Sequence, residues 1–225
     1  MSVPEPHLPD RLRYIAVEGV IGAGKSTLAR MLAERTGARL VLEEFEENPF
    51  LAAFYADPAR WAFQTQLAFL ASRFRQQKAL ATRDLFQQQT VADYTFDKDR
   101  IFAHVTLSGD ELQLYENLYG LMETSAPVPD LVVYLRSSVD RLLYNIALRG
   151  RSYEAQMDRA YIAELSDAYD RYFFHYARSP LLIINATQID FVREPAHFHE
   201  LLRQVARATS GTTHFNPPAQ TALAF

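Results

Sequence analysis

Short apolar runs alternate with longer amphipathic stretches along most of this chain. Apolar runs of about four to eight residues are typical of buried strands, whereas apolar positions that recur every three to four residues are typical of helices. The expected strands span residues 14–18, 39–43, 90–93, 130–135 and 181–185. The expected helices span residues 26–36, 57–83, 108–122, 138–148, 158–176 and 194–207. Strands separated by helices predict an α/β fold, with a mostly parallel sheet of about five strands and helices on both faces.

The two ends of the chain lack this periodicity. Residues 1–12 are polar and interrupted by prolines, and residues 208–225 mix Ser, Thr, Gly and a Pro pair. Both segments are expected to be loosely ordered tails around one domain at 13–207. The chain has 225 residues, of which 48% are hydrophobic, so that domain can bury a large core.

Composition narrows the classes of partner. The formal net charge is −4, which does not favour a nucleic-acid or anionic-membrane surface, so an anionic ligand must be captured locally. No cysteine is present, which excludes disulfides and thiolate metal sites and is compatible with the cytoplasm. No apolar run approaches the roughly 18 residues of a membrane span. A soluble, cytoplasmic protein with small-molecule ligands is therefore expected.

The strongest motif is the sequence GVIGAGKS at 19–26, which matches the pattern GxxxxGK[ST] between an expected strand and an expected helix. In such a P-loop, successive backbone N–H groups and the helix N-terminus face one anion. Lys25 would hold the β- and γ-phosphates, and Ser26 would bind Mg²⁺. The expected ATP-binding residues of this loop are Gly19, Val20, Ile21, Gly22, Ala23, Gly24, Lys25, Ser26 and Thr27. The motif alone does not distinguish a kinase from an ATPase or a switch protein.

Several further segments, in order along the chain, resemble the deoxynucleoside kinase family. They are EEFEENPF at 43–50, FLAAFYADPARWAFQTQLAFLASRF at 50–74, VADYTFDKDRIFA at 91–103, PDLVVYL at 129–135, LRGRSYE at 148–154 and IDF at 189–191. The bacterial deoxyadenosine and deoxyguanosine kinases are the most similar members. The resemblance implies a P-loop NTPase fold with an arginine-bearing lid and transfer of the ATP γ-phosphate to the 5′-hydroxyl of a deoxynucleoside, with a purine base preferred.

The resemblance implies that Glu43 is the catalytic carboxylate that accepts the proton of the 5′-hydroxyl. Its expected position at the end of a strand puts it at the ligand-binding edge of a parallel sheet. The sequence departs from the family at Glu44, where a proline is usual, so the choice between the two carboxylates stays open. The alternative is that these glutamates, with Glu46 and Glu47, form a solvated acidic run.

The resemblance also assigns residues to the nucleoside. Tyr55 and Glu154 correspond to positions that hold the sugar 3′-hydroxyl, and Trp61 and Phe63 lie in the helix that walls the site. Gln66 and Asp99 correspond to the pair that reads the base edge, with Arg73 close to both. A glutamine amide offers one donor and one acceptor in a plane, which suits a base edge. Each aromatic residue in this group has the alternative of being ordinary core.

Ser26 and Asp93 are the expected Mg²⁺ ligands, because hard cations prefer oxygen and Asp93 matches the family's acidic residue near the metal. The next residue is Tyr94, where many relatives carry an arginine that holds the transferring phosphate. Arg100 is the candidate substitute for that arginine.

The resemblance assigns the remaining cations and the adenine contacts. Arg149 and Arg151 match the lid arginines that close over ATP, although basic residues at a helix C-terminus are also common. Asp190 and Phe191 match the loop that flanks the adenine. A homodimer is expected on family grounds. The alternatives are a thymidylate-type nucleoside monophosphate kinase, which would need extra arginines for the acceptor phosphate, and a nucleotide-binding subunit without activity.

Overall fold

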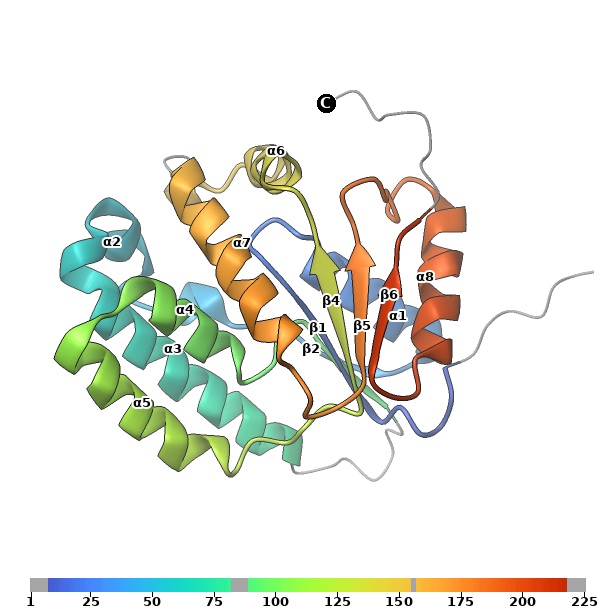
Figure 1. Ribbon diagram of the computed structural model, residues 1–225, viewed down its shortest axis with the longest axis horizontal. Helices are drawn as coiled ribbons and strands as arrows, with labels where there is room; N and C mark the ends of the chain where they lie inside the picture. The colour runs from blue at the N-terminus through green and yellow to red at the C-terminus, as the bar shows by residue number, and fades with distance from the viewer. Residues whose placement is uncertain (1–7, 82–88, 155–156, 218–225) are drawn as a thin grey trace, which may run out of the picture.

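A parallel six-stranded sheet forms the centre of the molecule (Figure 1). The computed structural model describes residues 8–81, 89–154 and 157–217. The sheet order is β2-β3-β1-β4-β5-β6, and every neighbouring pair is parallel. The strands are β1 (Tyr14–Gly19), β2 (Arg39–Val41), β3 (Thr90–Ala92), β4 (Leu131–Arg136), β5 (Leu181–Asn185) and β6 (Thr212–Phe215). The predicted α/β class is confirmed, with one strand more than expected.

Helices cover both faces of the sheet. They are α1 (Lys25–Thr36), α2 (Leu51–Ala56), α3 (Pro58–Ala81), α4 (Lys98–Thr106), α5 (Gly109–Glu123), α6 (Val139–Arg149), α7 (Arg159–Phe174) and α8 (Pro195–Arg207). In Figure 1, α1 and α8 lie on one side of the sheet, and α3, α4, α5 and α7 lie on the other. Within the described residues, no helix is both long and apolar enough to cross a membrane.

Two buried clusters hold these layers together. The larger one packs the strands against α1, α7 and α8, and β4 is buried along all but its last residue. The smaller one joins α2, α3, α4 and α5 through residues such as Phe54, Leu70 and Tyr115. Apolar burial is the main stabilising term in such a domain. The helical layer therefore forms a rigid wall beside the carboxyl ends of the central strands.

The structure adds two α-helices that the sequence pattern did not predict. Helix α4 has nine residues and begins with two buried charged residues, Lys98 and Asp99, which an apolar pattern does not mark as core. Helix α2 has only six residues and is separated from α3 by Asp57. Asp57 caps α3, because its carboxylate accepts the N–H of Arg60 at 3.3 Å.

The predicted tails need correction where the structure describes them. Strand β6 lies inside 208–225, and its alternating exposed and half-buried residues fit an edge strand rather than a loose tail. Near the other end, Leu8 and Leu12 are buried in the larger cluster. Residues 1–7 and 218–225 lie outside the described residues, as do residues 82 and 83 of the helix predicted at 57–83. Strand β2 ends at Val41, so Glu43 follows the strand by two residues.

Candidate active site

The loop between β1 and α1 has the backbone conformation that a P-loop requires. Gly22 has a φ of 86°, and a Cβ there would lie 2.6 Å from the carbonyl oxygen of Leu142, so only glycine fits. Gly24, with a φ of 93°, precedes the first residue of α1. The side chain of Asn145 donates to the Gly22 carbonyl at 2.8 Å and ties the loop to α6. Lys25 folds back over the loop, and its Nζ lies 3.1 Å from the Val20 carbonyl oxygen.

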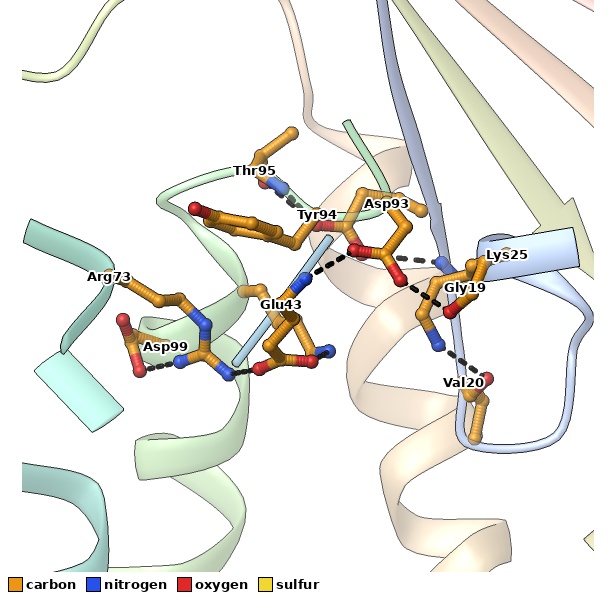
Figure 2. Close-up of polar contacts among 12 residues, drawn as sticks. Gly19, Val20, Lys25, Glu43, Arg73, Asp93, Tyr94, Thr95 and Asp99 are labelled. Carbon is orange, nitrogen blue, oxygen red and sulfur yellow. Dashed lines mark hydrogen bonds and ion pairs between the residues drawn. The ribbon is translucent and has the colours of Figure 1, made fainter. Parts of the chain in front are cut away.

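Asp93 connects the P-loop to the segment after β2 (Figure 2). One of its carboxylate oxygens accepts a hydrogen bond from Ser26 Oγ, and the other accepts the backbone N–H of Glu43 at 2.8 Å. The two predicted Mg²⁺ ligands therefore lie side by side and offer oxygen atoms, which fits a hard cation. The described residues contain no group of three or more acidic or histidine side chains that could hold a metal. An ion here would take its remaining ligands from phosphate oxygens and water.

Glu43 lies between two buried cations. Its carboxylate forms ion pairs with Arg73 of α3 and Lys98 of α4, and Arg73 also pairs with Asp99 (Figure 2). Burial alone would raise the pKa of Glu43, but the charges of Arg73 and Lys98 outweigh it and hold that pKa well below its usual range. Glu43 is therefore ionised at neutral pH.

The cavity around Glu43 is rich in positive charge. Its basic lining residues are Lys25, Arg73, Lys98, Arg149 and Arg151, and its acidic ones are Glu43, Asp93 and Glu154. This excess of cations contrasts with the net negative charge of the whole chain. Burial, together with the nearby charge of Lys98, lowers the pKa of Lys25 to about 8. The cavity thus suits a polyanion that would be captured locally.

The cavity around Glu43 collects most of the residues predicted to bind the nucleoside, and we call it the acceptor cavity. Tyr55, Gln66, Arg73, Asp93 and Glu154 line it. Its aromatic and aliphatic wall comes from residues that the sequence did not single out: Phe45, Leu51, Phe54, Phe69, Phe102, Tyr153 and Tyr161. Tyr55 stacks on Tyr153 with ring centroids 5.8 Å apart. The combination of an apolar wall and a few polar side chains is typical of a small-molecule site.

Three of the predicted residues do not line this cavity. Trp61 does not line it, and its ring stacks on Phe50 with centroids 5.8 Å apart in the wall of α2 and α3. Phe63 likewise packs in the smaller hydrophobic cluster. Asp99 lies behind the lining, fully buried against Arg73, so it acts on the cavity through that arginine.

A second cavity is lined by a different set of P-loop residues. Its lining combines loop residues with the predicted adenine contacts: Gly22, Ala23, Gly24, Thr27, Arg149, Asp190 and Phe191. Arg149 lines both cavities. Its guanidinium pairs with Glu154 at 2.6 Å, and Arg151 approaches the same carboxylate at 3.5 Å. One acidic residue therefore holds both predicted lid arginines at the junction of the two cavities.

Tyr94, which stands where many relatives carry an arginine, points away from the acceptor cavity. Its ring is fully buried, and its hydroxyl donates to Gln76 at 2.5 Å, so it does not line the acceptor cavity. Arg100 is wrong as the substitute cation, because its guanidinium is half-exposed and pairs with Glu116 of α5 at 2.9 Å. Lys98, near Arg100 on the same helix, does line the cavity, and the sequence pattern did not single it out. Lys98 is the first residue of α4 and Tyr94 lies in the loop before that helix, so no helical spacing relates the two residues.

Comparisons with known proteins agree with this geometry. The family model described as deoxynucleoside kinase matches residues 15–210. A deoxyguanosine kinase of Bacillus subtilis is 33% identical over 85% of this chain and 95% of its own length. A deoxyadenosine/deoxycytidine kinase of the same organism is 32% identical over 90% of this chain and 95% of its own length. The structure of deoxyadenosine kinase from M. mycoides with bound dATP matches with a TM-score of 0.75, at 25% identity over 86% of this chain and 98% of that one.

Proposed function

We propose that this chain phosphorylates the 5′-hydroxyl of deoxyadenosine, deoxyguanosine or both. The chain belongs to the deoxynucleoside kinase family and is an ATP-dependent deoxynucleoside kinase, and the proposal proceeds from that membership. The observation that carries the proposal is the position of Glu43, in one cavity with P-loop Lys25 and with the base-reading candidate Gln66. The names of the relatives include the purine nucleosides deoxyguanosine and deoxyadenosine, which supports a purine acceptor, and one relative is also named for the pyrimidine deoxycytidine. Membership of a family of deoxynucleoside kinases argues against the monophosphate kinase alternative, and turnover in the assay below would argue against an inactive subunit.

Glu43 would orient the 5′-hydroxyl and accept its proton. A carboxylate with a lowered pKa is a weak base, but the transition state of phosphoryl transfer is largely dissociative, so the nucleophile needs positioning more than early deprotonation. The two ion pairs that lower the pKa also fix the direction of the carboxylate.

Lys25, Lys98, Arg149 and Arg151 would neutralise the charge of the transferring phosphoryl group. Lys98 pairs with Glu43, and its charge also lowers the pKa of Lys25, so its ammonium lies near both the proposed base and the P-loop. That region is where the phosphoryl group must pass from donor to acceptor. Preorganised cations in a site shielded from water stabilise developing charge strongly. Lys98 would thus hold the transferring phosphate in place of the arginine that many relatives carry at the position of Tyr94.

The donor would lie in the second cavity, with its phosphates on residues 19–27 and its adenine against Asp190 and Phe191. Mg²⁺ would be held by Ser26, by Asp93 and by phosphate oxygens, and would supply charge neutralisation when bound. Arg149 and Arg151 would leave Glu154 in part as they close over the phosphates. Glu154 would then accept the sugar 3′-hydroxyl beside Tyr55, which excludes a bulkier ribose 2′-hydroxyl.

We propose a cytoplasmic homodimer. The apolar side chains of Leu114 and Leu121 on α5 are 50% and 76% exposed in a single copy, and a second copy would cover them. Light scattering of the purified protein tests this, and a monomeric mass at micromolar concentration would contradict it.

The reaction is tested by ADP release with ATP and Mg²⁺ against the four common deoxynucleosides and their monophosphates. Glu43→Gln keeps the shape of the side chain but cannot accept the proton, so kcat should fall by about 10²- to 10⁴-fold. Glu44→Gln is the matched control, because Glu44 is exposed and lines neither cavity; it should keep kcat within about twofold. Turnover of a purine deoxynucleoside that Glu43→Gln leaves intact would contradict the role of Glu43.

A further inference from the structure

Thr106, the last residue of α4, fixes the orientation of the Gln66 side chain. Its Oγ lies 2.9 Å from the carbonyl oxygen of Phe102 and 3.1 Å from the Gln66 amide nitrogen. A carbonyl oxygen can only accept, so the single hydroxyl proton of Thr106 is directed at Phe102. The Gln66 atom that faces Thr106 must therefore donate, and only the amide nitrogen can do so. The hydrogen-bond chemistry itself determines which way the amide points.

The other end of this amide has no partner. Gln66 lines the acceptor cavity and is only 2% exposed, and its carbonyl oxygen is buried without a hydrogen bond within the described part of the chain. Buried acceptors are normally paired, so this oxygen is available for a donor on the ligand. The guanidinium Nε of Arg73, which lines the same cavity, is likewise buried and unpaired among the described residues.

We infer that Thr106 is a positioning residue that sets base specificity through Gln66. This inference rests on the proposed role of Gln66 in reading the base. Thr106 does not line the cavity and so does not touch the base. By holding the amide nitrogen, it presents the carbonyl oxygen as a fixed acceptor, and the base must offer an N–H at that point.

The consequence concerns bases that differ by an amino group and an oxo group at one position. Adenine and hypoxanthine form such a pair, since their donor and acceptor positions are exchanged along the same edge. An amide that is free to rotate by half a turn serves both patterns, whereas a fixed amide serves one and leaves a polar group unpaired against the other. Thr106 therefore converts an adaptable glutamine into a selective one.

The test compares kcat/KM for deoxyadenosine and deoxyinosine in the wild-type enzyme and in Thr106→Val. Valine keeps the branched shape but cannot accept from the amide. The wild-type enzyme should favour one of the two nucleosides by at least about tenfold, and Thr106→Val should bring that ratio about tenfold nearer to one. The change should fall mainly in KM, because the base lies away from the reacting atoms. If the enzyme prefers pyrimidines, deoxycytidine and deoxyuridine form the equivalent pair.

Two further variants separate the possible outcomes. Thr106→Ser keeps the hydroxyl and should keep the wild-type ratio, which distinguishes orientation of the amide from helix packing. Gln66→Leu should abolish the ratio. A deoxyadenosine-to-deoxyinosine ratio that is unchanged in Gln66→Leu would contradict the base-reading role of Gln66. A ratio that is lost in Gln66→Leu but unchanged in Thr106→Val would overturn the role of Thr106 alone. A wild-type ratio within about threefold of one would also overturn it.

Discussion

Replacing Lys98 by methionine tests the proposed charge arrangement most directly. Methionine has a similar length and can fill the same space, but it carries no charge. Lys98 is 6% exposed at its side chain and pairs with Glu43, which keeps its second ion pair with Arg73 in the variant. The substitution therefore removes one cation from the site while the proposed base stays ionised and oriented.

The expected loss follows from the position of the ammonium. Two unit charges about 4 Å apart interact by about 4 kcal/mol at an effective dielectric constant of 20, and the low exposure of Lys98 limits screening by water. Loss of one preorganised group that stabilises transition-state charge costs about 10²- to 10³-fold in kcat. Removal of Lys98 also raises the pKa of Lys25, because their mutual repulsion disappears. Lys25 thus becomes more fully charged, so it cannot account for a loss of rate.

The assay is steady-state ADP release at saturating ATP and Mg²⁺ with the preferred deoxynucleoside. We expect kcat to fall by about 10²- to 10³-fold in Lys98→Met, with the KM for the nucleoside changed by less than about threefold. Arg100→Met is the matched control. It removes a cation from the same helix, but one that pairs with Glu116 at the surface, so kcat should stay within about twofold.

The opposite pattern would refute this reasoning. A Lys98→Met enzyme with normal kcat, beside an Arg100→Met enzyme with a large loss, would make Arg100 the phosphate-binding cation and require α4 to rotate during turnover. Thermal melting of both variants shows whether either loss of rate reflects unfolding.

Two more predictions concern the donor side. Burial lowers the pKa of Lys25 to about 8, so part of the unliganded protein carries a neutral Lys25 above that pH. Bound triphosphate favours the charged form, so ATP binding should take up a fraction of a proton and weaken as the pH rises through about 8. Calorimetry in buffers of different ionisation enthalpy measures the uptake, which should vanish in Lys25→Arg; uptake that persists there would assign it to another group. Asp93→Asn should raise the Mg²⁺ concentration for half-maximal rate by about 10- to 100-fold, and an unchanged Mg²⁺ titration would remove Asp93 from the metal site.

The elements that the sequence predicted well share a strong local signal. Strand β4 is an uninterrupted apolar run that lies buried in the middle of the sheet, and α6 begins at Ser138, whose side chain caps the helix by accepting from Arg141 at 3.3 Å. Elements without such signals were missed. Strand β6 is short and polar on alternate residues, and it exists because the edge of β5 offers it hydrogen bonds.

The sequence by itself determined the P-loop, because a fixed spacing of glycines, lysine and serine within eight residues encodes both the turn and its chemistry. Only the tertiary structure decided which charges meet. Glu43, Arg73 and Lys98 come from a loop and two different helices, and no local pattern marks a buried lysine 55 residues after a glutamate as its partner. The tertiary structure likewise turned Tyr94 and Arg100 away from the cavity and Lys98 into it. The physical reason is that ion pairing in a buried site depends on distances of a few ångström, which chain packing sets and residue order alone does not.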